Sequence, residues 1–197
     1  MTMLVLINYK DGVILAADKR AVWKNGSEVS HVVSDEVDKI YTWNGGYIAG
    51  SGYAPLLENV KDFAAKNTIN SADEIADYLR LVIQNSSIHQ QWINTSNFAL
   101  IYGTSSGFRA VTLSAKNYEM RALEADGVSI MIGKIDTSLF EEQLKSEIKN
   151  PNPNIHNVID ILKKLFKHVS SLDITVSCDF DFSIINSNGM AMGKIDC

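Results

Sequence analysis

The sequence predicts an α+β fold in which two antiparallel sheets pack together and helices cover both outer faces, a four-layer αββα sandwich. The order of the expected elements is strands, two helices, strands, two helices and strands. The first two strand segments are nearly continuously apolar, so both of their faces should be covered. No repeat, low-complexity segment or long linker divides the chain, which predicts a single domain over residues 1–197.

The chain is expected to begin with a hairpin of two strands, over residues 3–9 and 13–18. Gly12 ends the segment between them, which favours a three-residue loop with a left-handed glycine. That loop places Asp18 on the same face as Thr2, one diagonal step away, at about 7–8 Å. A two-residue loop would turn Asp18 to the other face, because side chains alternate along a strand.

The following segments complete the sandwich. A second hairpin is predicted over 38–43 and 46–49, with Asn44-Gly45 as a type I′ turn. Apolar residues at helical spacing predict one helix around Leu56 and another behind Ser71, with Glu74 completing a capping box. The remaining predictions are strands near 97–103, 107–113, 118–125 and 128–132, helices over 138–149 and 155–169, and a final hairpin over 179–185 and 190–194.

Composition excludes several classes of function. The net charge is -5 and no basic stripe occurs, which argues against a nucleic-acid partner. No apolar run reaches the roughly 20 residues of a membrane span. The N-terminus lacks a basic start and a small-residue cleavage site, so we expect a cytoplasmic protein with no membrane partner.

The cysteines and histidines show no metal-ligand spacing, which predicts no metal and no cofactor. Cys178 and Cys197 form no CxxC motif, and a reducing cytosol is the simpler interpretation, with one disulfide as the alternative. Asp179 and Asp181 project from one face of a strand, where a solvated or interface role is favoured over cation binding.

Thr2 is the first candidate catalytic residue. A threonine hydroxyl needs a base to remove its proton. Removal of Met1 would leave Thr2 with a free α-amine, whose ordinary pKa of about 7.7–8.0 suits a base near neutral pH. Nucleophile and base would then sit on one residue, although most proteins that start Met-Thr carry an ordinary strand residue there.

Three further residues can support this chemistry. The ammonium of Lys39, held near Thr2 by Asp18, would lower the pKa of the hydroxyl and the amine. Gly52, in Ala49-Gly50-Ser51-Gly52 before the first helix, can present its backbone N–H to a developing oxyanion. Taken singly, a surface ion pair and a tight turn explain these residues as well.

Together the motifs resemble one family. Thr2 followed by LVLINYKDGVILAADKRA, then VDKIY, then IAGSGYA, is similar to the N-terminal third of proteasome β subunits and of the bacterial HslV-type peptidase. The match covers about 60 residues. It implies the N-terminal-nucleophile (Ntn) hydrolase fold, assembled into homo-oligomeric, stacked rings whose active sites face a chamber. It also implies a peptide or unfolded-protein substrate and an ATP-dependent unfoldase as partner.

The resemblance implies a role for each site residue. Thr2 is the nucleophile and general base of a threonine endopeptidase, Asp18 and Lys39 are the supporting pair, and Gly52 is the oxyanion donor. Family members also use an Asp and a Ser before the final hairpin. Asp173 fits the first, and Ser177 lies within one residue of the second.

The chain also departs from the family, which leaves alternatives open. The stretch from Thr2 to Lys39 is longer than usual, so we expect an extra loop near residues 23–31, at the chamber entrance or substrate cleft. Lys134 replaces the serine of the usual Gly-Ser-Gly, and Met3 replaces a small polar residue. A divergent bacterial proteasome homologue is the leading hypothesis. The alternatives are a catalytically silent ring-forming or binding homologue and an acyl transferase or ligase.

Overall fold

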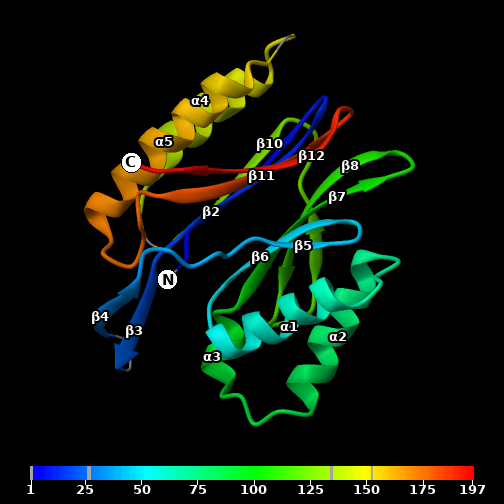
Figure 1. Cartoon of the computed structure of the whole chain (residues 1–197), viewed down its shortest axis with the longest axis vertical. Coiled ribbons are helices and arrows are strands. Elements are labelled where there is room, and N and C mark those ends of the chain that lie inside the picture. The colour runs from blue at the N-terminus through cyan, green and yellow to red at the C-terminus, as the bar shows by residue number, and fades with distance from the viewer. Residues whose placement is uncertain (1, 26–27, 134, 152) are drawn as a thin grey trace.

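The computed structural model describes residues 2–25, 28–133, 135–151 and 153–197. They form a mixed α+β structure with three antiparallel sheets and five helices (Figure 1). Within these residues, no helix combines the length and the apolar character needed to cross a membrane. Lys134 lies outside them, so its predicted position is not described.

Two five-stranded sheets carry most of the chain. The first sheet contains β1 (Leu4–Tyr9), β2 (Gly12–Asp18), β10 (Gly127–Met131), β11 (Phe180–Asn186) and β12 (Gly189–Ile195), in the order β10-β1-β2-β11-β12. The second sheet contains β5 (Tyr41–Trp43), β6 (Gly46–Ser51), β7 (Asn97–Thr104), β8 (Gly107–Ser114) and β9 (Met120–Ala122), in the order β5-β6-β7-β8-β9. The smaller third sheet pairs β3 (Ala21–Asn25) with β4 (Glu28–Ser34).

The helices follow the predicted order with one addition. They are α1 (Ala54–Lys66), α2 (Ala72–Gln84), α3 (Gln90–Asn94), α4 (Ser138–Ile148) and α5 (Ile155–Leu172). The short α3 was not predicted, because five residues are too few to show a helical period. Ser71 is the N-cap residue of α2 as expected, but within the described residues its side chain forms no capping hydrogen bond. The Glu74 carboxylate accepts instead from the Asn70 N–H at 3.2 Å.

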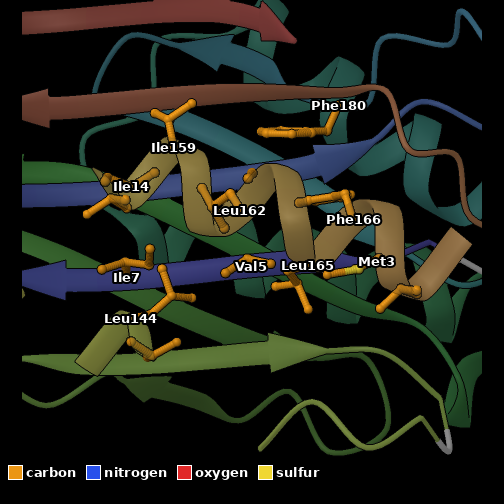
Figure 2. Packing of buried hydrophobic residues seen from close by; sticks show 14 of the residues in the cluster. Met3, Val5, Ile7, Ile14, Leu144, Ile159, Leu162, Leu165, Phe166 and Phe180 are labelled. Carbon is orange, nitrogen blue, oxygen red and sulfur yellow. The ribbon is translucent and has the colours of Figure 1, made fainter. Parts of the chain in front are cut away.

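The apolar residues form three clusters. One joins the first sheet to α4 and α5; Figure 2 shows Leu162 and Phe166 of α5 packed with Val5, Ile14 and Phe180 of its strands. The second joins the second sheet to α1 and α2. The third, which we call the middle cluster, contains residues of both sheets: Leu4, Leu6, Val13, Leu15, Ala17, Ile40, Tyr47, Ala49, Ala99, Ile101, Ala110 and Ile185.

The predicted register of the first hairpin is wrong. Tyr9 pairs with Gly12, so the loop contains only two residues, and the backbone of Asp18 lies opposite Met3. Gly12 has no positive φ; instead, a Cβ on it would lie 2.4 Å from the carbonyl oxygen of Ile185. Close approach of β11 is therefore the reason for this glycine.

Two other local predictions also need correction. The turn at Asn44-Gly45 joins β5 to β6 as expected, but neither residue has the positive φ that a type I′ turn requires. The segment expected to be an extra loop near residues 23–31 is largely the β3–β4 hairpin, which has register shifts next to Ala21 and Trp23. Residues 26–27 lie outside the described residues.

Candidate active site

The peptide that joins Thr2 to Met3 is held from both sheets. Ser51, at the end of β6, donates its hydroxyl to the Thr2 carbonyl oxygen at 3.0 Å. From the first sheet, Asp18 Oδ1 accepts the Met3 N–H at 2.8 Å. The Met3 side chain is fully buried in the cluster with α5 (Figure 2). These contacts fix the start of β1, while Thr2 itself remains partly exposed.

Asp18 is the centre of the hydrogen-bond network. It is fully buried at the end of β2. Its Oδ2 accepts from Lys39 Nζ at 2.9 Å and from the Arg20 N–H at 3.0 Å. Because its backbone lies opposite Met3, alternation places Asp18 on the other face from Thr2, and the prediction of a shared face is wrong. Asp18 is the last residue of β2, and its carboxylate contacts the Met3 N–H and the Lys39 ammonium from that other face.

Lys39 presents a buried cation beside this carboxylate. Its Nζ donates to Asp18 Oδ2 and, at 2.7 Å, to the Arg20 carbonyl oxygen. An ammonium has three hydrogens, and the described residues supply these two acceptors, which leaves one hydrogen for a group in the cleft that Lys39 lines. Burial lowers the pKa of Lys39, and the charge of Asp18 opposes that effect.

Ser177 joins the network from the segment before β11. Its N–H points to Asp18 Oδ2 at 3.4 Å, and its hydroxyl accepts the Lys19 N–H at 2.9 Å and donates to the Asp179 carbonyl at 2.7 Å. Ser177 therefore supports Asp18 and the turn after β2.

Gly52 lies between α1 and β6, a strand of the second sheet. Its φ of +132° is a conformation that only glycine adopts without strain, and a Cβ would lie 2.5 Å from Ser96 Oγ. Pro55 follows in the first turn of α1, where it suits a helix start. The sequence thus fixes Gly52 in one backbone conformation next to the cleft.

A cleft of about 1160 Å³ lies beside the Asp18 network. Thr2, Lys39, Ser51 and Gly52 line it, as does Trp23 of the β3–β4 hairpin. A volume of this size accommodates a ligand as large as a short peptide. The extra segment thus borders this cleft through Trp23, and its structure is a hairpin and not a loop.

Asp173 lies apart from this network. It caps the C-terminus of α5, and its Oδ1 accepts from the N–H and hydroxyl of Thr175 at 2.8 and 2.7 Å. In the described part of the chain, its side chain makes no hydrogen bond to Asp18 or Lys39. These side-chain contacts belong to the local turn that follows α5.

Sequence reasoning missed three residues of the site. Ser51 and Arg20 flank recognised motif residues, but their roles depend on contacts between distant segments. Arg20 also bonds to both carboxylate oxygens of Asp35, at 2.5 and 2.9 Å. Lys61, by contrast, could have been identified from the sequence, because a lysine in the apolar stripe of α1, between Leu57 and Ala64, indicates a buried charge.

Lys61 is a second buried cation that lines the cleft. Its Nζ lies 2.8 Å from Glu58 Oε1 and 4.2 Å from the centre of the Tyr41 ring. Tyr41 donates its hydroxyl to Glu58 Oε2 at 2.8 Å. Burial and this carboxylate raise the pKa of Tyr41 to about 12. One wall of the cleft thus carries the ion pair of Lys61 with Glu58.

In comparisons with known proteins, no family profile matches the chain, and no curated protein matches it. Any assignment of function therefore depends on the site geometry and on the resemblance of the N-terminal motifs.

Proposed function

We propose that the chain is a threonine endopeptidase of the N-terminal-nucleophile type. One observation carries the proposal: buried Asp18 binds both the Met3 N–H, next to the proposed nucleophile, and the ammonium of Lys39, which lines a cleft together with Thr2 and Gly52. The hairpin register that first linked Asp18 to Thr2 does not support the proposal, whereas these contacts do.

The proposed reaction begins after Met1 has been removed, which frees the Thr2 α-amine. The Thr2 hydroxyl attacks the substrate carbonyl and the amine takes its proton. The Lys39 ammonium favours the deprotonated hydroxyl by charge proximity. The Gly52 N–H donates to the tetrahedral oxyanion. As this intermediate collapses, the scissile C–N bond breaks and the Thr2 ammonium gives its proton to the departing amine. Water then hydrolyses the ester between the acyl group and Thr2, which restores the free hydroxyl.

We also propose that the fold is the four-layer αββα sandwich of Ntn hydrolases. Three clusters support this arrangement, one between the sheets and one between each sheet and its helices. Rings of identical subunits and an unfoldase partner would follow from membership of that family, and they belong to the same proposal.

The test compares Thr2 variants on short peptide amides with a fluorogenic leaving group. The intact mass of the protein first establishes that Met1 is absent. We expect Thr2→Ala to lower kcat/KM by at least about a thousandfold, because it removes the nucleophile. Thr2→Ser keeps a hydroxyl and an α-amine, and should retain measurable activity and form a covalent acyl-enzyme.

Thr95→Ala is the matched control. Thr95 also lines the cleft, but its hydroxyl bonds to the carbonyl oxygens of Gln91 and Trp92 in α3. This variant should keep wild-type kcat. Undiminished activity in Thr2→Ala, with the fold intact by circular dichroism, would refute the proposal.

A further inference from the structure

The two cysteines, far apart in the sequence, meet beside the Asp18 network. The last paired residues of β11 and β12 are Phe180 and Ile195. If the same antiparallel register continues for two residues, Cys178 lies opposite Cys197. Opposed residues of antiparallel strands have Cα atoms about 4.5–5.5 Å apart, which falls in the range of about 4.4–6.8 Å that a disulfide spans.

The side chains agree with this register. The sulfur atoms of Cys178 and Cys197 and a carboxylate oxygen of Asp179 all lie within 4.8 Å of one another. Asp179 Oδ1 accepts the Cys197 N–H at 2.7 Å and the Cys178 thiol at 3.8 Å. The Asp179 carboxylate thus contacts both cysteines. Cys197 is exposed to solvent.

We propose that Cys178 and Cys197 form a reversible disulfide. The oxidant is a small disulfide such as oxidised glutathione. The thiolate of one cysteine attacks a glutathione sulfur and releases one glutathione thiolate. The other cysteine thiolate then attacks the protein sulfur of this mixed disulfide and releases the second. The protein loses two protons and two electrons, and one oxidised glutathione becomes two reduced ones.

The ligand set favours a disulfide over a metal site. Zinc in proteins usually takes four tetrahedral ligands, or three with a water at a catalytic site. In the described residues this cluster offers three candidate ligands, and the carboxylate oxygen among them already accepts two hydrogen bonds. A disulfide needs only the two sulfur atoms. It removes the hydrogen of the Cys178 thiol and leaves the bond from the Cys197 N–H to Asp179 in place.

The bond would act on the segment that supports Asp18. Ser177 precedes Cys178, and its N–H and hydroxyl contact Asp18, Lys19 and Asp179. Joining Cys178 to Cys197 would therefore fix this segment against the end of β12. The inference depends on these contacts and not on the proposed peptidase activity.

The test is an oxidation series of the whole chain in glutathione buffers, with free thiols trapped by alkylation. Reduced protein should gain two alkyl groups in its intact mass, and oxidised protein none. Trypsin cleaves after Lys167 and Lys194. Without reduction, it should give residues 168–194 joined to residues 195–197. Deuterium exchange of the amides of residues 177–179 should slow on oxidation.

Cys178→Ser and Cys197→Ser are the matched controls. Each can form only intermolecular disulfides, with glutathione or with a second chain, and at one buffer ratio its oxidised fraction should be at least about tenfold lower, because the wild-type reaction is intramolecular. Glutathione adducts or linked dimers as the main wild-type products would overturn the proposal. So would a reduced protein that retains one equivalent of zinc through both cysteines and resists oxidation.

Discussion

At the scale of single residues, Asp18 accepts hydrogen bonds from Met3, Arg20, Lys39 and Ser177 and is completely buried. Removing one charge of its pair with Lys39 leaves the other buried without compensation. We expect Asp18→Asn and Lys39→Met each to lower the free energy of unfolding by about 3–5 kcal/mol.

The double variant Asp18→Asn/Lys39→Met tests the coupling. Neither charge then remains, so the loss in the free energy of unfolding should be clearly smaller than the sum of the single losses. Denaturant unfolding of the wild type and the three variants measures this difference. Additive losses would show that the two charges do not depend on each other.

The buried ammonium of Lys39 also predicts a pH dependence. Burial lowers its pKa in the folded protein below the ordinary value of 10.5. Between the folded and unfolded pKa values the unfolded chain binds more protons, so stability rises with pH through that window. The wild type should therefore gain stability relative to Lys39→Met as the pH rises toward about 10.5, which unfolding at a series of alkaline pH values measures. A difference that is constant or decreases with pH would contradict this assignment.

The sequence predicted part of this site because some of its residues lie in compact motifs. Lys39 and Gly52 fall in VDKIY and IAGSGYA, and the structure places both at the cleft. Asp173 shows the limit, because a carboxylate after a helix serves equally well to hold a local turn, and only its contacts distinguish the two roles. Ser51 and Arg20 act through partners far along the chain, which no local pattern reveals.

At the scale of elements, Gly12 tests the packing of β2 against β11. A Cβ at this position would lie 2.4 Å from the Ile185 carbonyl oxygen, which is backbone and cannot turn aside. We expect Gly12→Ala to lower the free energy of unfolding by about 1–3 kcal/mol. Denaturant unfolding gives this value.

Gly103→Ala is the control for that substitution. Gly103 also lies in a strand, but a Cβ there would meet nothing within 4 Å and no positive φ is involved. This variant should match the wild type or be slightly more stable, because alanine restricts the unfolded chain. Equal losses in the two variants would show that close approach of β11 is not the reason for Gly12.

The first hairpin shows why register was harder to predict than strand position. Both strands were predicted within a residue or two from their apolar runs. Those runs are buried on both faces, so they contain no alternation that could fix the register. Gly12 was then interpreted as a turn residue, whereas its constraint comes from β11, more than 160 residues away in the sequence.

At the scale of the whole molecule, the order of the elements other than α3 and the β3–β4 hairpin was predictable, because periodicity changes clearly between segments. The middle cluster was not identified residue by residue, since it requires the relative placement of both sheets. It contains residues from β1, β2 and β11 of the first sheet and from β6, β7 and β8 of the second. This shared cluster should make the two sheets unfold together.

Two leucine variants test that cooperativity. Leu15 belongs to the middle cluster, and Leu162 to the cluster with α5 (Figure 2); both are fully buried. Each change to alanine should lower the free energy of unfolding by about 2–5 kcal/mol. Leu139→Ala, at a position that is 60% exposed, is the control and should stay within about 0.5 kcal/mol of the wild type.

The fluorescence of Trp43 distinguishes one cooperative unit from two. Trp43 packs in the cluster of α1 and α2, so it reports on the second sheet, whereas Leu162 packs against the first. With Trp23 and Trp92 changed to Phe, Trp43 becomes the only fluorescent tryptophan. If the middle cluster couples the sheets, Leu162→Ala should shift the Trp43 transition and the circular dichroism transition by the same amount. A Trp43 transition that stays in place while the circular dichroism transition moves would show that the sheets unfold separately.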